Sequence, residues 1–245
     1  MIPAAVSPPP ERRLSLVEQT SGRLAEHIIA EFSRQIDPHA DTWLPSEREL
    51  AVRFGVSRPV IREATKRLEL QGFIEIQHGR GIKVVHQLQR PLSRSLQFDI
   101  PDSLERLRQL NETRRILEPE SARLAALRAD ADALAALRSC HRELAECTDL
   151  AQAARIDARF HEQIARAAGN AIVALVLSSL GDLGETSRLR TLSQSGLKKA
   201  IAHHEAILAA IEAGLPDDAA KLMRTHVEEA ATDLEASEGI ATRTA

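Results

Sequence analysis

The chain has 245 residues, 43% hydrophobic and 27% charged, with a formal net charge of −3. This composition is that of a globular protein, and the length suffices for two compact cores. The first residues lack an apolar stretch of signal-peptide length, and the longest apolar run, residues 171–177, is too short to cross a bilayer. We therefore expect a cytoplasmic protein that is neither exported nor embedded in a membrane.

Charge is divided unevenly along the chain. Residues 1–95 carry 14 basic and 11 acidic side chains, whereas residues 96–245 carry 18 basic and 24 acidic ones. A basic first part and an acidic second part are typical of a protein that presents only its amino-terminal part to a polyanion. The two cysteines, Cys140 and Cys147, are expected to be reduced thiols, in keeping with a reducing compartment.

The proline-rich residues 1–11 are predicted to be a disordered tail, and residues 12–86 the first domain. Within it, Ser46 and Glu49 form the sequence pattern of a capping box, which starts a helix that ends at Gly55. Ser57 is the expected N-cap of the next helix, which has a proline in its first turn. Two short helices joined in this way predict a helix-turn-helix.

A predicted hairpin follows the second of these helices. Residues 73–77 and 82–85 alternate in polarity as two strands, and the glycine-containing residues 78–81 join them. Helix-turn-helix and hairpin together predict a winged helix-turn-helix domain that binds double-stranded DNA. The alternative is a small structural α/β module whose arginines form a solvated face.

Arg58 and Arg62 lie four residues apart on one face of the second helix. Arginine presents a planar fork that matches guanine or a phosphate, and the start of a recognition helix meets base edges in the major groove. We expect these two side chains to contact bases. Arg80 in the wing is expected to contact phosphate, because the flanking glycines permit a close approach of the backbone.

The sequence from Leu44 to Val85 resembles, nearly position by position, the DNA-binding domain of the GntR family of bacterial transcription regulators. One departure is the stretch QIDPHADTW, where that family shows a glycine-bearing turn. One winged helix reads only a few base pairs, so we expect a homodimer on a palindromic operator. The resemblance implies DNA contacts from Arg48, Ser57, Arg58, Arg62, His78 and Gly79.

Residues 87–102 are predicted to be an interdomain linker, residues 103–237 a helical domain for effector binding and dimerisation, and residues 238–245 a tail. Alanine and leucine recur in the helical domain at helical spacing without a strand signal. The predicted fold class is therefore mainly α, with an antiparallel all-α bundle of six or seven helices after the winged domain. Loop signals place helices at residues 103–129, 131–147, 150–168, 170–193, 196–213 and 217–236.

Four polar residues of the bundle are candidate metal ligands. Asp157 and His161 are four residues apart on one helix face, and His204 and His226 are equidistant from a predicted tight turn at residue 215, so they should face each other. One carboxylate and three imidazoles suit zinc, nickel, cobalt or manganese, with positions left for water or a ligand. The alternative is that each histidine is a hydrogen-bonded core residue.

The segments DARFHEQIARAAGN, HEAILAAIEAG and RTHV resemble the all-helical FCD effector domain of the FadR subgroup of GntR regulators. That resemblance implies a divalent metal, zinc by preference, bound by Asp157, His161, His204 and His226. His203 is expected to face the surface, about 100° away around the helix, and is the fallback ligand.

Arg114 is predicted to point inward from the first bundle helix. From the residues alone, it either pairs with Glu118 or a neighbouring helix, or holds an anion. The resemblance implies that it lies near the effector pocket and clamps a carboxylate.

The predicted function is a DNA-binding transcriptional regulator, by preference a repressor. Its operator affinity would be controlled by a small organic acid or sugar acid bound at the metal. The alternatives are a regulator with a purely structural metal and no effector, and a metal-dependent hydrolase. We expect that the chain is not an enzyme, because no separate acid or base is identified beside the cluster.

Overall fold

The computed structural model describes residues 14–32, 42–85, 87–100 and 103–241. The predicted tail at residues 1–11 lies outside these residues. The chain divides into two compact units, Met1–Pro91 and Leu92–Ala245. Within the described residues, no helix is both long enough and apolar enough to span a membrane.

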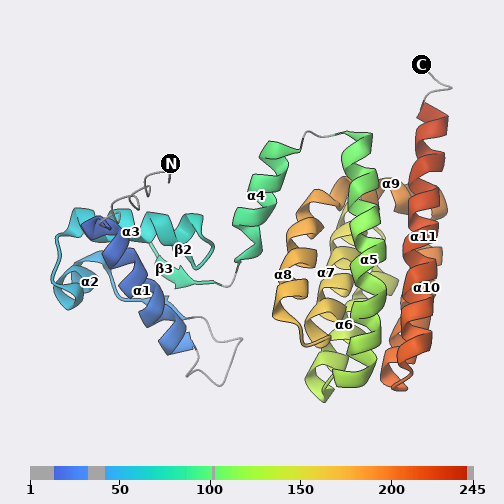
Figure 1. Cartoon of the computed structure of the whole chain (residues 1–245), viewed down its shortest axis with the longest axis horizontal. Coiled ribbons are helices and arrows are strands. Elements are labelled where there is room, and N and C mark those ends of the chain that lie inside the picture. Colours follow the sequence, from blue (N-terminus) through green and yellow to red (C-terminus); the bar gives the residue numbers. More distant parts are fainter. Residues whose placement is uncertain (1–13, 33–41, 86, 101–102, 242–245) are drawn as a thin grey trace, which may run out of the picture. The chain divides into compact units, whose positions relative to one another are not determined.

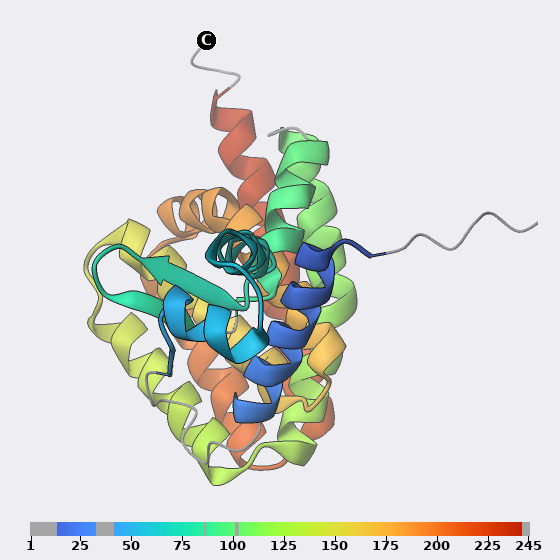
Figure 2. The same ribbon diagram turned by 90° about the vertical axis from the view of Figure 1, so that its left-hand side faces the viewer.

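In its described residues, the first unit contains three complete helices and a small sheet (Figures 1 and 2). The antiparallel sheet has the strand order β1-β3-β2, and its core is made of leucine and isoleucine side chains of the helices and of β2 and β3. The elements are α1 (Leu16–Phe32), β1 (Trp43–Leu44), α2 (Glu47–Phe54), α3 (Arg58–Leu70), β2 (Ile74–Gln77) and β3 (Gly81–Val84).

The helix starts and ends confirm most of the local predictions. Both hydrogen bonds of the capping box are present, since the Glu49 amide donates to Ser46 Oγ and the Ser46 amide donates to the Glu49 carboxylate. Gly55 has a φ of 66°, which is the left-handed conformation expected after α2. Ser57 is the N-cap residue of α3, as predicted, although its side chain makes no capping hydrogen bond.

The strand β1 was not predicted. It pairs with β3 through Trp43 opposite Lys83 and Leu44 opposite Ile82, which turns the expected two-stranded wing into a three-stranded sheet. The residues just before α2 are thereby attached to the wing. Residues 33–41, which contain most of the departure from the family sequence, lie outside the described residues.

The second unit is an antiparallel bundle built around α5, α7, α10 and α11, with alanine, leucine and isoleucine filling the core (Figure 1). Its helices, with α4 beginning before the boundary, are α4 (Gln89–Asp99), α5 (Leu104–Arg128), α6 (Ala131–Glu146), α7 (Leu150–Ala167), α8 (Ala171–Leu183), α9 (Glu185–Ser195), α10 (Leu197–Glu212) and α11 (Pro216–Ala241).

Three predicted boundaries differ from the structure. The helix predicted at residues 170–193 is divided into α8 and α9 at Gly184, whose amide hydrogen-bonds to the carbonyls of Leu180 and Gly181. The predicted linker holds α4, whose Ser93 hydroxyl donates to the Ser179 carbonyl at 2.8 Å. The last helix continues to Ala241, into the residues predicted as a tail.

Candidate functional site

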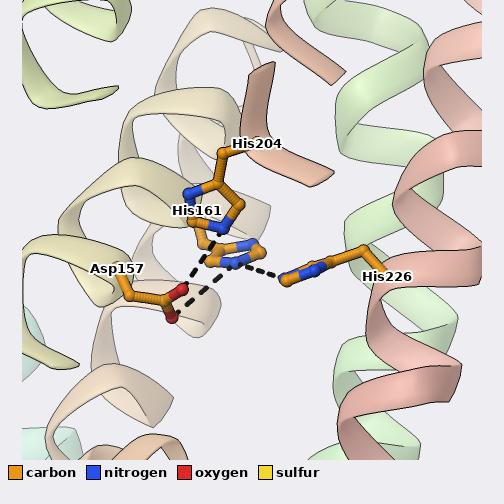
Figure 3. Close-up of side chains that lie close together, drawn as sticks. All are labelled: Asp157, His161, His204 and His226. Atoms are coloured by element: carbon orange, nitrogen blue, oxygen red, sulfur yellow. Dashed lines mark hydrogen bonds and ion pairs between the residues drawn. The ribbon is translucent and has the colours of Figure 1, made fainter. Parts of the chain in front are cut away.

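The structure brings the four candidate metal ligands together inside the bundle (Figure 3). Each residue offers one ligand atom, and these atoms all lie within 4.8 Å of one another. The residues come from three helices: Asp157 and His161 from α7, His204 from α10 and His226 from α11. All four side chains are buried, and His204 is 0% exposed.

Helix geometry explains why the four residues meet. Asp157 and His161 share one face of α7, as their spacing predicted. The helices α10 and α11 form a hairpin around Gly214, whose φ is 65°, and the ring centroids of His204 and His226 lie 5.0 Å apart. The prediction that these two histidines face each other across a tight turn is therefore confirmed.

The ligand atoms converge on one point. His204 Nε2 lies 3.2 Å from Asp157 Oδ1, and His226 Nε2 lies 3.2 Å from His161 Nε2. His161 Nε2 in turn lies 3.8 Å from Asp157 Oδ2. Three imidazole nitrogens and a carboxylate oxygen thus point toward a shared centre, as Figure 3 shows.

The hydrogen bonding of His204 fits a metal better than a satisfied core histidine. Within the described residues, neither ring nitrogen of His204 has a hydrogen-bond partner of acceptable geometry, although Asp157 is close to Nε2. Buried polar atoms are normally paired, so the unpaired ring nitrogens of His204 indicate that a further partner binds here. One oxygen and three nitrogen donors form a set that zinc and neighbouring divalent ions accept.

Protonation in the metal-free protein also suits metal binding. Burial lowers the pKa of His204, and burial together with the other two imidazoles lowers the pKa of His226 well below its usual value. Burial alone would raise the pKa of Asp157, but the close approach of His204 and the nearby imidazole and guanidinium charges outweigh it and lower the pKa. Neutral imidazoles and an ionised carboxylate are the forms that bind metal.

Arg114 is buried on α5, as predicted, and it makes the ion pair with Glu118 that was one of the two roles considered for it. Its Nε donates to Glu118 Oε1 at 2.7 Å, which is the ion pair that the spacing allowed. Its Nη2 also lies 3.4 Å from His161 Nε2. Burial disfavours the Glu118 carboxylate, yet Arg114 and His161 hold the pKa of Glu118 well below its usual range.

Sequence reasoning missed Arg188. This buried side chain on α9 donates from Nε to Asp157 Oδ2 at 2.9 Å. Burial and the nearby Arg114 guanidinium lower the pKa of Arg188, and Asp157 opposes that effect. Because Arg188 comes from a separate helix after the break at Gly184, no spacing along the chain relates it to the metal ligands.

A pocket adjoins two of the four ligands, Asp157 and His226, and residues of α9, α10 and α11 supply most of its lining. Arg114 and Arg188 line it beside Asp157 and His226, while Lys199 and other polar side chains line its remaining wall. Lys199 pairs there with Glu229 and Asp233 at 2.9 and 3.2 Å. Two buried guanidiniums, each paired with a carboxylate of the bundle, thus lie beside the candidate metal centre.

His203 was predicted to face the surface, and this was wrong. Its side chain is only 21% exposed, lies 3.3 Å from Glu229 through Nε2 and lines the pocket. Its ring centroid lies 5.4 Å from that of His226. Although His203 is about 100° from His204 around the same helix, it contacts side chains of α11.

The predicted DNA-contacting side chains of the first unit are at its surface. Arg48, Ser57, Arg58, Arg62 and the tip residues His78, Gly79 and Arg80 are exposed. Arg62 pairs with Glu47 on α2, with 3.1 Å between Nη2 and Oε2. Arg80 places its guanidinium carbon 5.6 Å from the centroid of the Trp43 ring.

Comparison with known protein families matches both units. The family described as bacterial regulatory proteins, gntR family, matches residues 18–84, and the FCD domain matches residues 109–229. These matches agree with the resemblance found in the sequence. They place a DNA-binding head before an FCD domain.

Relatives and a solved structure agree with this assignment. The chain is 34% identical over 196 residues to the Glc operon transcriptional activator of Escherichia coli, covering 75% of this chain and 77% of the relative. It is 26% identical over 222 residues to the transcriptional repressor NanR of Cronobacter sakazakii, covering 88% and 85%. The solved structure of Streptococcus agalactiae GntR is 26% identical with a TM-score of 0.67, covering 88% of this chain and 99% of that chain.

Proposed function

Since the chain belongs to the GntR family of bacterial regulatory proteins and carries an FCD domain, we propose that a small carboxylate and a divalent metal control its affinity for an operator. That the chain is a DNA-binding regulator follows from its family membership. The alternative of a metal-dependent hydrolase is disfavoured, because the matching families and relatives are regulators. The observation that carries the proposal is the buried Asp157-His161-His204-His226 cluster, which borders a pocket with two buried arginines. We place the chain in the FadR subgroup and in the cytoplasm.

The proposed DNA contacts lie on two elements of the first unit. Arg58 and Arg62, with Ser57, would meet base edges from the start of α3, and Arg48 would support them from α2. The wing residues His78, Gly79 and Arg80 would contact the backbone beside the major groove. In support, all seven of these residues are exposed.

The proposed effector site combines the metal with two cationic side chains. When bound, a zinc, nickel, cobalt or manganese ion supplies a Lewis-acidic centre with open positions for oxygen ligands. Asp157 and the three histidines would hold it. Arg114 and Arg188 would hold the carboxylate of an organic or sugar acid by charge-assisted hydrogen bonds, while Lys199 and its acidic partners would face its polar remainder.

The control of DNA binding is a linkage between two sites. An acid can weaken operator binding only to the extent that it prefers the bundle arrangement in which the two DNA-binding heads are wrongly spaced. We propose repression relieved by the acid. Activation requires the opposite preference, and the similarity to one activator and one repressor accommodates either sign.

A homodimer is proposed because two heads are needed for an inverted repeat. Helix α8 exposes Ile172 at 76% and Leu175 at 37%, three residues apart on one face. We propose that this face of α8 contacts a second copy, since burial of exposed apolar side chains favours association. Sedimentation of the native protein and of Ile172→Glu tests it: the native protein should be dimeric and the variant dissociate. A monomeric native protein contradicts the proposal.

The experiment begins with selection of a duplex from a random-sequence pool by the native protein. Affinity for that duplex is then measured at fixed salt with zinc-loaded and chelator-treated protein, in the presence of a panel of small hydroxy acids and sugar acids. We expect one acid to change the affinity at least about tenfold, or 1.4 kcal/mol, only with metal present. If zinc stays bound but no acid changes the affinity for the duplex, the alternative of a purely structural metal is favoured.

A further inference from the structure

The strand β1, which the sequence did not predict, holds Trp43 next to the wing strand β3. Trp43 pairs with Lys83 of β3, and the amide of Val84 donates to the Thr42 carbonyl at 2.8 Å. The residue is therefore held by sheet pairing although it precedes the helix-turn-helix in the chain. It is also the chain's single tryptophan, and the chain contains no tyrosine.

The indole of Trp43 contacts both the charged and the glycine residue at the end of the wing. The Arg80 guanidinium carbon lies 5.6 Å from the ring centroid, within the range of a cation–π interaction. A Cβ atom built on Gly81 would lie 3.5 Å from the ring, at ordinary van der Waals distance, so the indole stands beside this glycine. Gly81 has a φ of 125°, which favours glycine at this point of the turn.

The backbone of Arg80 is fixed independently of its side chain. The Arg80 amide donates to the Gln77 carbonyl at 3.0 Å, and Gly79 adopts a φ of 77°. Only the long side chain then remains to be ordered. Ordering a long arginine side chain from solution costs rotamer entropy, part of which a stacked conformation removes in advance.

We propose that Trp43 is a positioning residue that holds the Arg80 guanidinium ready for a phosphate of the bound duplex. Stacking engages the face of the guanidinium, whereas its N–H donors lie in the plane of the group and stay free for oxygen atoms. The indole thus orients Arg80 without consuming its hydrogen bonds. This inference rests on the proposed contact between the wing and DNA.

A double-mutant cycle with Trp43→Leu and Arg80→Ala tests the proposal. The probe is the duplex selected by the native protein, together with a scrambled duplex at low salt. Each single variant should lose about three- to tenfold in affinity for both duplexes, and the double variant should lose little more than Arg80→Ala alone. Independent effects, in which the two losses multiply, would overturn the proposal.

His78→Ala is the matched control, because His78 is at the same tip yet makes no ring contact with Trp43 among the described residues. Its loss of affinity should multiply with that of Trp43→Leu. Thermal melting checks that each variant folds. If Trp43→Leu does not fold, Trp43→Phe replaces it and should retain part of the coupling, since phenylalanine is a weaker cation–π partner. No coupling with phenylalanine would overturn the proposal.

Tryptophan fluorescence provides a readout independent of affinity, because all tyrosine and tryptophan emission comes from Trp43. Arg80→Ala should expose one face of the indole and raise its acrylamide quenching in the free protein. Adding the selected duplex should lower quenching in the native protein. Unchanged quenching in both comparisons would overturn the inference, whereas a native protein that selects no duplex would instead refute the proposed DNA contacts.

Discussion

The carboxylate of Glu118 lies 2.9 Å from Nδ1 of His161, on the side of the ring opposite the candidate metal centre. The other ring nitrogen, Nε2, faces Asp157 and His226. A carboxylate behind a histidine ligand fixes the orientation of the ring and raises its basicity. Arg114 holds Glu118 in turn, so the two helices α5 and α7 share one connected network around the ligand.

The first prediction concerns Glu118→Gln. Loss of the negative charge behind His161 should lower zinc affinity about 10- to 100-fold, measured by competition with a chromogenic chelator. Glu120→Gln is the matched control, because Glu120 lies on the same helix but is exposed and pairs with Arg123. Equal zinc affinity in the two variants would contradict the role of Glu118.

Glu118→Gln also leaves Arg114 without its charged partner inside the bundle. Breaking a buried ion pair costs about 3–5 kcal/mol of unfolding free energy. Urea unfolding therefore accompanies the zinc measurement, and affinity is compared only under conditions in which both variants are folded.

The second prediction is a loss of stability in acid for the chelator-treated protein. The pKa values of His204 and His226 are lowered in the fold, chiefly by burial, from an unfolded value near 6.5. Below about pH 6.5 the unfolded chain therefore binds protons that the folded chain does not, and the free energy of unfolding falls. The slope should approach about 1.4 kcal/mol per pH unit for each group.

Urea unfolding at pH 7, 6 and 5 measures this slope in the native protein and in His226→Gln. The variant should show a smaller slope because it lacks one of the two groups. A further loss below about pH 4 is expected from Asp157 and Glu118, whose pKa values are lowered in the fold. If the free energy of unfolding falls in parallel for the two proteins between pH 7 and 5, His226 is not a source of the loss of stability.

The third prediction uses two glycines around the break between α8 and α9. A Cβ atom at Gly184 would lie 2.4 Å from Arg188 Nη1, whereas one at Gly181 would meet nothing within 4 Å. Gly184→Ala should displace Arg188 from Asp157, costing about 1–3 kcal/mol of unfolding free energy and weakening acid binding. Gly181→Ala should keep acid binding and be neutral or stabilising. Calorimetric titration with the identified acid measures the binding, and equal acid affinity in both variants would count against Arg188.

The fourth prediction concerns base reading. Arg58→Ala should cost about 1–3 kcal/mol of binding free energy on the selected duplex and reduce discrimination against the scrambled one. Arg142→Ala, a change on the surface of the bundle, is the control. If Arg58→Ala binds the selected duplex as the control does, α3 does not read bases through this side chain.

Local signals predicted the features that depend on short stretches of chain. The capping box at Ser46, the left-handed Gly55 and the shared face of Asp157 and His161 each follow from residues within one or two helical turns. The meeting of His204 with the other ligands required only the length of two helices around a turn. Such relationships can be predicted from the sequence because helical geometry is regular.

The missed features depend on packing between distant segments. Arg188 reaches Asp157 across α7 and α9, and Glu118 reaches His161 across α5 and α7. No periodicity encodes either contact. The strand that carries Trp43 has two residues, too few for alternation to appear, and it forms because the wing offers an edge for pairing.

The most direct test of metal-dependent effector binding is thermal melting against a panel of small carboxylates. It compares zinc-loaded native protein, chelator-treated protein and His204→Gln. At a hundred times its dissociation constant, a ligand should contribute about 2.7 kcal/mol, a shift of several degrees. We predict that one acid raises the melting temperature of the zinc-loaded native protein alone. An acid that stabilises all three proteins equally, or no acid that stabilises any, would contradict a metal-dependent effector site.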